Sequence, residues 1–348
     1  MSPSIDGYID RSPEGASVDG GGPVDPCRQR AAGLGRPGAR PAEVNEPLLI
    51  VEDLRVSFPN RDGGLTEAVR GVSFTLGRER LGIVGESGSG KSQTGRAILG
   101  LSAAEAQISA KRLEFKGTDL LRCSDQQRRR LRGGRIAMVL QDPKYSLNPV
   151  MSIGAQIVET LRAHLPQSAA QARAKALQAL AAVSIDDPER VYDLYPHEVS
   201  GGMGQRAMIA MMLIADPELL IADEPTSALD VTVQLQVLAI LDKLVSGMPL
   251  GHRDAMSVPQ GERENLGRPG VSPRGMGLIL ISHDLRLVAS FCDRILVMYA
   301  GRVVEEIEAG SLHAAQHPYT RGLLNCLPVL GELRHPLPTL DRQAEWLL

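Results

Sequence analysis

The amino-acid sequence predicts an α/β fold in which a helical insert interrupts a core of alternating strands and helices. Short apolar runs of strand length recur along the chain, as at 80–84, 219–222 and 277–281. Stretches with a helical period separate several of these runs, and residues 152–193 have a helical pattern throughout. The chain has 348 residues, of which 43% are apolar, so it is long enough to bury the core that such a fold requires.

The expected elements alternate along the chain from residue 48. Runs rich in β-branched and other apolar residues predict strands at 48–58, 68–76, 80–84, 112–115, 135–140, 219–222, 277–281 and 294–308. Apolar residues at helical spacing predict helices at 91–101, within 152–193, at 204–215 and at 231–246. No internal repeat is evident, so we expect a single such unit.

Two stretches depart from this pattern. Residues 1–46 are rich in glycine, proline, arginine and serine and lack periodicity, so we expect a disordered tail there. Residues 246–275 are polar and rich in proline and glycine, which favours a flexible surface loop between a helix and a strand.

The composition argues against several classes of protein. Aromatic residues make up 3% of the chain, too few for a surface that stacks single-stranded nucleic acid, and the net charge of −3 indicates no polyanionic partner. The four cysteines have neither metal-site nor redox spacing, so we expect free thiols in a reducing cytosol. No apolar run approaches the ~20 residues of a membrane-spanning helix. The acidic N-terminal region lacks the apolar segment of a secretory signal.

A glycine-rich segment between the strand at 80–84 and the helix at 91–101 fits the pattern G-x-x-x-x-G-K-[ST] at every position. Its residues are Gly85, Glu86, Ser87, Gly88, Ser89, Gly90, Lys91 and Ser92. Glycines let backbone N–H groups turn toward phosphate oxygens, and the helix N-terminus adds partial positive charge. We expect Lys91 to reach the β- and γ-phosphates and Ser92 to bind Mg²⁺. The alternative, a chance glycine-rich turn, does not account for the flanking strand and helix.

Two acidic residues follow the apolar strand expected at 219–222. Asp223 suits Mg²⁺, directly or through water, and Glu224 suits the general base that activates the attacking water. Two acids after a strand are more often a helix N-cap when they occur alone. Together with the glycine-rich segment they favour a site that hydrolyses a nucleoside triphosphate.

The stretch Val199–Arg206, with the sequence VSGGMGQR, resembles the ABC signature motif, usually written LSGGQ or, in peptide importers, LSGGMxQR. Val199 stands in place of the usual leucine, and Gly204 stands where a longer residue is common. Ser200 can cap the helix that follows, and the two glycines after it let N–H groups approach a phosphate. The resemblance implies that four residues face the ATP of a partner subunit: Ser200, Gly201, Gly202 and Gln205.

The remaining motifs of the ABC family occur in the family's order. Gln141 matches the Q-loop glutamine, which contacts Mg²⁺ and water in the family. Residues 224–230 match Walker B running into the D-loop, which contains Asp230. His283 matches the switch histidine, which contacts the γ-phosphate in the family. Phe58 is the aromatic residue expected to stack on adenine, although a strand phenylalanine is often only a core residue. The resemblance therefore implies catalytic roles for Glu224, His283 and Gln141.

This resemblance covers about residues 48–330 and implies a P-loop (RecA-like) core, an antiparallel β subdomain and an α-helical subdomain that carries the signature. In these terms the ATPase domain spans 47–312, with its helical subdomain at about 143–203. Residues 313–348 form a C-terminal extension of the oligopeptide-importer type.

Three further stretches resemble the ATPases of dipeptide, oligopeptide and nickel importers: QDPKYSLNP at 141–149, YPHE at 195–198 and HPYTRGLL at 317–324. The branch implies ATP and Mg²⁺ as cofactors and a peripheral position on the cytoplasmic face of the inner membrane. It implies as partners a second ABC ATPase, expected to be a distinct paralogue, two transmembrane permease subunits and an extracytoplasmic solute-binding protein. Some relatives hold an iron–sulfur cluster in a C-terminal cysteine group, which Cys326 alone cannot build.

Three alternatives stay open at this point. The solute can be nickel or a metallophore instead of a peptide, because these importers share the ATPase motifs. The chain can be an ABC ATPase that does not transport; the arginine run at 128–132 would fit nucleic acid, although we expect a solvated helix face and no nucleic-acid partner. It can also be a regulatory ATP-binder with little turnover, against which Glu224 and His283 argue.

Overall fold

The computed structural model describes residues 47–142, 146–227, 230–246, 275–326 and 346. All of them belong to one compact unit, Asn45–Leu348. The tail predicted at 1–46 and nearly all of the loop predicted at 246–275 lie outside the described residues. Among the described residues, no helix combines the length and the apolar character needed to cross a lipid bilayer.

The first sheet is antiparallel and has the strand order β2-β1-β5-β6, with β4 also paired to β1. Its strands are β1 (Leu49–Pro59), β2 (Leu65–Leu76), β4 (Gln107–Ser109), β5 (Arg112–Phe115) and β6 (Thr118–Asp119). Side chains alternate between buried and more exposed along much of β1 and β2, as expected of a sheet with one face on the core.

The second sheet has the strand order β11-β10-β3-β9-β8-β7. Its strands are β3 (Arg80–Val84), β7 (Ile136–Val139), β8 (Leu219–Asp223), β9 (Gly277–Ser282), β10 (Arg294–Tyr299) and β11 (Arg302–Glu308). All neighbours are parallel except β10 and β11, which form an antiparallel hairpin. Every residue of β7, β8 and β9 is buried, because helices cover both faces of this part of the sheet.

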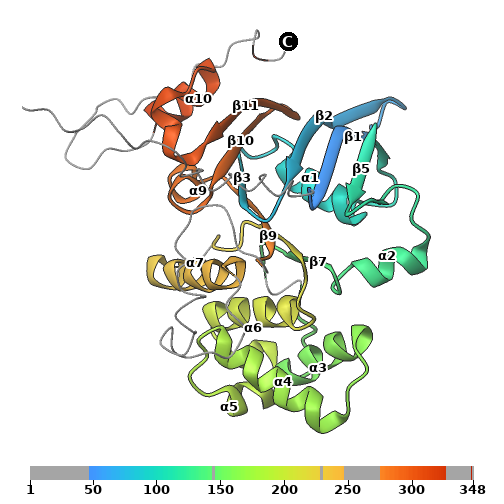
Figure 1. Cartoon of the computed structure of the whole chain (residues 1–348), viewed down its shortest axis with the longest axis vertical. Coiled ribbons are helices and arrows are strands. Elements are labelled where there is room, and N and C mark those ends of the chain that lie inside the picture. The colour runs from blue at the N-terminus through green and yellow to red at the C-terminus, as the bar shows by residue number, and fades with distance from the viewer. Residues whose placement is uncertain (1–46, 143–145, 228–229, 247–274, 327–345, 347–348) are drawn as a thin grey trace, which may run out of the picture. The chain divides into compact units, whose positions relative to one another are not determined.

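Helix α1 (Lys91–Leu99) packs between the two sheets, and its Ala97, Ile98 and Leu99 share one apolar cluster with strands of both. Helix α9 (Leu285–Phe291) lies against β3, where Val288 and Cys292 fill the space beside Gly82. Helix α7 (Val231–Val245) and the C-terminal helices η4 (Ala309–Ala314) and α10 (Pro318–Asn325) complete this core (Figure 1).

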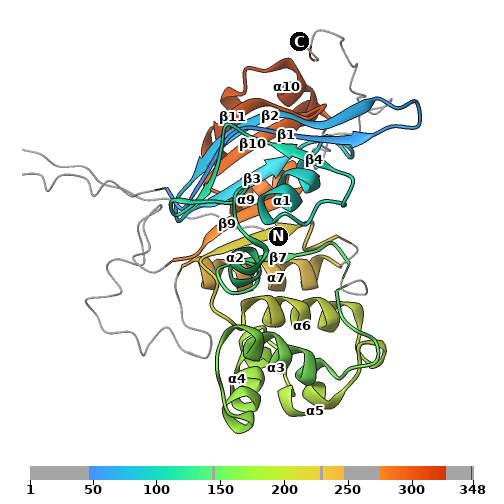
Figure 2. The same cartoon turned by 90° about the vertical axis from the view of Figure 1, so that its right-hand side faces the viewer.

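Four helices and a short 3-10 turn form a separate layer: α3 (Ile153–His164), α4 (Ala169–Ala182), α5 (Pro188–Asp193), η2 (Pro196–Glu198) and α6 (Gly201–Leu213). Figures 1 and 2 show these helices gathered at one end of the unit, with α7 between them and the β10–β11 hairpin. Side-chain oxygens of Ser152, Ser168, Asp187 and Ser200 accept backbone N–H groups and so begin four of these helices.

The α/β fold with an antiparallel β subdomain and a helical subdomain is the one that the sequence predicted, and several element ends differ by a few residues. Helix α1 ends at Leu99 instead of residue 101 because Gly100 adopts φ 62° and closes the helix. Helix α6 begins at Gly201, three residues before the expected start, because Ser200 caps it. The short strands β4 and β6 were not predicted, and helix α2 (Asp125–Leu131) was expected only as a helix face for the arginine run at 128–132.

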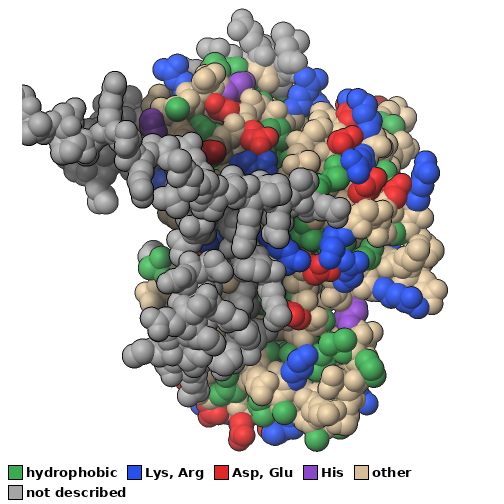
Figure 3. All heavy atoms as spheres, viewed as in Figure 1, with side chains coloured by type: hydrophobic (Ala, Val, Ile, Leu, Met, Phe, Trp, Pro, Cys, Tyr) green, Lys and Arg blue, Asp and Glu red, His purple; other side chains and the backbone are tan. Residues whose placement is uncertain are grey.

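The expectation of a solvated helix face for the arginine run at 128–132 was wrong for two of its residues. Arg129 and Arg130 are exposed, but Arg128 and Arg132 are half-buried and donate to backbone carbonyl oxygens. Residues four apart share one side of a helix, so these two point inward together. On the face seen in Figure 3, the side chains of described lysines and arginines alternate with acidic ones and form no continuous basic field.

Candidate nucleotide site

Four neighbouring strands of the second sheet end at the same edge, and each is followed by one of the predicted nucleotide-binding or catalytic residues. Strands β3, β9, β8 and β7 are parallel and adjacent, so their carboxyl ends meet. The glycine-rich loop follows β3, His283 follows β9, Glu224 follows β8, and Gln141 lies just after β7. Clefts outside the carboxyl ends of parallel strands are the usual ligand sites of such sheets.

The loop from Gly85 to Gly90 leaves no room for side chains at two of its glycines. A Cβ on Gly85 would lie 2.1 Å from the carbonyl oxygen of Met298, and a Cβ on Gly90 would lie 2.5 Å from that of Ala68. Gly90 also has φ 97°, and it caps α1 without a side-chain hydrogen bond. The backbone N–H groups in the first turn of α1 are therefore left for an anion.

Lys91 is buried at the start of α1, and its ammonium group is folded back on the loop. Its Nζ donates to the carbonyl oxygens of Gly85 at 2.8 Å and Glu86 at 2.7 Å. Burial lowers the pKa of Lys91, and the negative charges of Glu224, Asp223 and Glu86 partly offset this. An ammonium held by loop carbonyls can move to phosphate oxygens, which give it a stronger, charge-assisted contact.

Ser92 and Asp223 bring two oxygen ligands together beside Lys91. The Ser92 hydroxyl donates to Asp223 Oδ1 across 2.8 Å, and the Asp223 side chain is buried. Burial raises the pKa of Asp223, while the hydrogen bond from Ser92 and the charges of Arg96 and Lys91 lower it in part. A hydroxyl and a carboxylate side by side are oxygen donors of the kind that Mg²⁺ prefers.

Glu224 contacts both of the other predicted catalytic side chains. Gln141 Nε2 donates to Glu224 Oε2 at 3.1 Å, and His283 Nδ1 lies 3.3 Å from Glu224 Oε1. The backbone of Glu224 has φ 49°, an unusual value outside glycine, and its N–H donates to the carbonyl oxygen of Ile281 at 2.9 Å. The strained backbone thus holds the carboxylate between the side chains of Gln141 and His283, which follow β7 and β9.

The tip of α6 is open to solvent. Ser200 and Gly201 are exposed, and the Ser200 hydroxyl accepts the N–H of Met203 at 3.3 Å. Gly202 is half-buried against Val233 of α7. The first N–H groups of α6 therefore lie at a surface that another chain can approach.

Gln205 is placed differently from the sequence-based expectation. Its side chain is 1% exposed, and its Nε2 donates to the carbonyl oxygen of Pro225 at 2.7 Å. Five positions after the cap, a side chain of α6 points to the core side of the helix and not to the exposed tip. Gln205 thus links the signature helix to the segment after Glu224 and does not face outward with Ser200.

Two further predicted residues have local roles in the structure. Asp230 is exposed, and its Oδ1 accepts the N–H groups of Thr232 and Val233, which begins α7. Phe58 is half-buried on β1, where it packs against the apolar cluster between the sheets. Neither a D-loop role for Asp230 nor adenine stacking by Phe58 is tested by these contacts, and both stay predictions.

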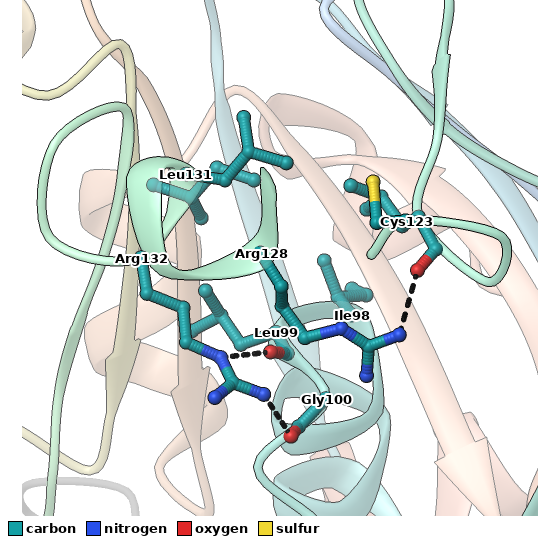
Figure 4. Close-up of a pocket in the computed structure, with 9 residues that line it drawn as sticks. Ile98, Leu99, Gly100, Cys123, Arg128, Leu131 and Arg132 are labelled. Carbon is teal, nitrogen blue, oxygen red and sulfur yellow. Dashed lines mark hydrogen bonds between the residues drawn. The ribbon is translucent and has the colours of Figure 1, made fainter. Parts of the chain in front are cut away.

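The other end of α1 is held by Arg132, which the sequence did not single out as functional. Arg132 donates from Nε to the carbonyl oxygen of Leu99 at 2.7 Å and also to that of Gly100 (Figure 4). A guanidinium at a helix C-terminus satisfies carbonyls that have no partner in the helix. Burial, and then the charge of Arg128, lower the pKa of Arg132.

One residue of the C-terminal helix also reaches this site. The Tyr319 hydroxyl of α10 accepts the backbone N–H of Glu86, in the glycine-rich loop, at 3.0 Å. In the sequence, the motif around Tyr319 indicates a branch of the family and no contact with the loop. A contact between residues 233 positions apart leaves no local sequence pattern. The fold and this edge together define a P-loop nucleotide-binding protein.

Comparisons with known proteins agree with this class. A family model described as ABC transporter matches residues 69–227. The dipeptide transport ATP-binding protein DppD of Escherichia coli (strain K12) is 42% identical over 295 residues, which cover 84% of this chain and 82% of that protein. A probable peptide ABC transporter ATP-binding protein, y4tR, of Sinorhizobium fredii (strain NBRC 101917 / NGR234) is 46% identical over 284 residues, covering 81% and 77%.

A likeness in fold is seen with the dimeric structure of MJ0796, a bacterial ABC transporter cassette. It has a TM-score of 0.61 at 23% identity and covers 75% of this chain and 98% of that one. The identities of 42% and 46% to the two relatives above, each over more than four fifths of this chain, show that the chain belongs to the ABC transporter family. The motif resemblance inferred from the sequence, including its peptide-importer branch, is confirmed, and so is the prediction of an ATPase of this family.

Proposed function

We propose that this chain is the ATP-binding and ATP-hydrolysing subunit of an importer for dipeptides or oligopeptides. The observation that supports it most directly is the meeting of Lys91, Ser92, Asp223 and Glu224 at the carboxyl edge of adjacent parallel strands. Relatives named as dipeptide, oligopeptide and peptide import ATP-binding proteins support the kind of solute.

In this proposal the glycine-rich loop and the start of α1 bind the triphosphate. The uncapped N–H groups at Gly90 and beyond face phosphate oxygens, and Lys91 leaves the carbonyls of Gly85 and Glu86 to contact the β- and γ-phosphates. Ser92 and Asp223 hold Mg²⁺, directly or through water, and the ion offsets the charge of the phosphates when it is bound. The oxygen pair already present suits that ion.

Glu224 is the general base in the proposed reaction. Its carboxylate accepts a proton from the attacking water, and Gln141 and His283 orient that carboxylate from either side. His283 is largely exposed, so it is free to turn from Glu224 toward a γ-phosphate. These three side chains lie on separate strand ends, so the site depends on the register of the sheet.

The exposed tip at Ser200 and Gly201 implies a second ATPase chain. Backbone N–H groups at a helix start favour an anion. The glycine-rich loop of this chain leads into a different helix, α1, so the tip of α6 is not needed for the phosphates that this loop binds. We therefore infer that the tip closes over a nucleotide on a partner, expected to be a distinct paralogue. Two permease subunits and a solute-binding protein complete the importer, with this chain peripheral on the cytoplasmic face of the inner membrane.

The test is to purify the membrane complex through this chain and to measure its ATPase activity with added solutes. We expect dipeptides or oligopeptides to stimulate turnover in the presence of the solute-binding protein. Lys91→Ala should abolish ATP binding and turnover, whereas Lys111→Ala, which changes a lysine with a 76% exposed side chain, should leave both intact. Stimulation by a nickel chelate and not by peptides would overturn the solute class, and ATP binding unchanged in Lys91→Ala would overturn the site.

A further inference from the structure

The C-terminal helix α10 contacts the glycine-rich loop through one fully buried residue. Tyr319 is 0% exposed, and its hydroxyl accepts the N–H of Glu86 at 3.0 Å, although 233 positions separate them. Within the part of the chain that the structure describes, Tyr319 thus joins a segment after the last strand to the loop. A buried tyrosine hydroxyl placed on a backbone N–H defines the position of that peptide group.

The surroundings of Tyr319 keep its ring in one place. Its N–H donates to His317 Nδ1 at 3.2 Å, which begins α10. The ring of Tyr299, at the end of β10, lies 4.5 Å away between centroids, and the ring of Trp346 lies 5.7 Å away. Because β10 is parallel to β3, Tyr299 ends at the same edge of the sheet as the glycine-rich loop. An aromatic ring fixed on two sides gives its hydroxyl little freedom.

The peptide groups on both sides of Glu86 are fixed, but by different residues. The carbonyl oxygen of Glu86 accepts from Lys91 Nζ at 2.7 Å and from the N–H of Ser89 at 3.2 Å. The N–H of Glu86 donates to Tyr319. When Lys91 moves to a bound phosphate, the carbonyl loses a charged partner, whereas the contact with Tyr319 does not depend on the lysine. Tyr319 is then a contact that helps to keep the first turn of the loop in position, together with the bond between Ser89 and the carbonyl oxygen of Glu86.

We propose that Tyr319 is a positioning residue for nucleotide binding, and that α10 therefore contributes to the affinity of the nucleotide site. The inference rests on the proposed function of the loop as the ATP site. The stretch HPYTRGLL at 317–324 resembles a branch of the family, but that resemblance does not itself imply a role for α10 at the nucleotide site. Tyr319 acts through the loop backbone and does not itself touch the nucleotide.

The test compares Tyr319→Phe with Tyr299→Phe in the full-length chain. Each variant removes one hydroxyl from the same aromatic cluster, but among the described contacts the Tyr299 hydroxyl has no hydrogen bond to the loop. The loss of the hydrogen bond to Glu86 predicts about fivefold weaker ATP binding, and an equal rise in KM, for Tyr319→Phe only. The kcat at saturating ATP should stay within about twofold, since Glu224 and its partners are untouched.

A merely structural role gives a different pattern. In that case Tyr319→Phe lowers the melting temperature and the active fraction, so that kcat falls while KM and the dissociation constant of ATP match the Tyr299→Phe control. That result would overturn the proposal. Trp346 is the one tryptophan in the sequence and lies edge-on to both tyrosines, so its fluorescence gives a second readout. We expect ATP to change that fluorescence in the native chain and in Tyr299→Phe, and to change it less in Tyr319→Phe.

A measurement on the native chain covers the case in which Tyr319→Phe does not fold. Amide hydrogen exchange at Glu86 should be slow before ATP is added, because this N–H is already bonded, and it should stay slow afterwards. Fast exchange at Glu86 in the native chain would overturn the proposal. The Lys91→Ala variant distinguishes a failure of the proposed function from a failure of this inference. If Lys91→Ala binds ATP as tightly as the native chain, the proposed function fails. If Lys91→Ala loses ATP binding but Tyr319→Phe binds ATP as tightly as the native chain, only this inference fails.

Discussion

The Ser92 hydroxyl and the Asp223 carboxylate are joined by a hydrogen bond of 2.8 Å between the start of α1 and the end of β8. Both oxygens therefore lie together, and the cost of burying the Asp223 carboxylate is offset only in part by the Ser92 hydroxyl and nearby positive charges. That cost raises the pKa of Asp223 above its usual value of 3.8. A group kept in an unfavourable environment in this way is common at functional sites, where stability is given up for binding.

This arrangement predicts that Asp223→Asn separates stability from metal binding. Asparagine can still accept the Ser92 hydroxyl but has no charge to bury, so we expect the free chain to be as stable as the native one or up to about 1 kcal/mol more stable. The Mg²⁺-dependent gain in ATP affinity should be lost. Urea unfolding and ATP titration with and without Mg²⁺ measure the two effects, with the exposed Asp186→Asn as control. An undiminished Mg²⁺ effect would rule out Asp223 as a ligand.

Glu224→Gln should keep ATP binding and lose turnover. The amide can still bond to Gln141 and lie beside His283, so the geometry of the strand ends should be preserved. It cannot accept a proton, so we expect ATPase activity to fall about a hundredfold or more. The ATP-loaded variant should accumulate as a closed dimer with its partner, measured by size-exclusion chromatography. Turnover at the native rate would show that another group is the base; the exposed Glu189→Gln is the control.

Gln205→Leu tests the link between α6 and the segment after Glu224. Leucine fills a similar volume but leaves the buried carbonyl oxygen of Pro225 without its partner, so we expect a loss of about 1–2 kcal/mol in stability. Because Pro225 follows Glu224 directly, ATPase activity should also decrease. The exposed Gln236→Leu on α7 is the matched control. If both variants unfold at the same urea concentration as the native chain, the hydrogen bond has no energetic weight.

The meeting of the predicted catalytic and phosphate-binding residues at one edge was largely predictable from the sequence because each of them follows a buried strand. The loop before Lys91, the acids after β8 and His283 after β9 each stand where an apolar run ends, and parallel strands place such residues at one edge. The direction of Gln205 was not predicted, because it depends on which side of α6 packs on the core. The contacts of Arg132 and Tyr319 were missed for a similar reason, since they join segments through tertiary packing and leave no local pattern.

Arg132→Met tests whether the guanidinium stabilises the end of α1. The variant keeps much of the aliphatic packing around Leu99 and Gly100 but removes the donors to their carbonyl oxygens. Burial of the charge offsets part of the gain, so we expect a net loss of about 1 kcal/mol. Arg129→Met changes an exposed arginine of the same helix and should have a smaller effect. Equal urea midpoints for the two variants would contradict the capping role.

Glu218 should make the stability of the chain sensitive to acid. Its carboxylate accepts hydrogen bonds from Lys116 and from Arg135, the latter at 2.7 Å. Burial alone would raise the pKa of Glu218, but these hydrogen bonds and positive charges together outweigh it and hold the pKa below its usual value of 4.5. At pH values near 4.5 the Glu218 carboxylate therefore binds more protons in the unfolded chain than in the folded chain.

The sign of the effect follows from that difference. The stabilisation by Glu218 is fully present above the unfolded pKa of 4.5 and is lost as the pH falls through the lower folded value. We expect Glu218→Gln to be less stable than the native chain at neutral pH, and the gap to shrink between about pH 5 and pH 3. The exposed Glu308→Gln, measured by urea unfolding at the same pH values, is the control. A gap for Glu218→Gln that stays constant across this range would show that the carboxylate is not held ionised by Lys116 and Arg135.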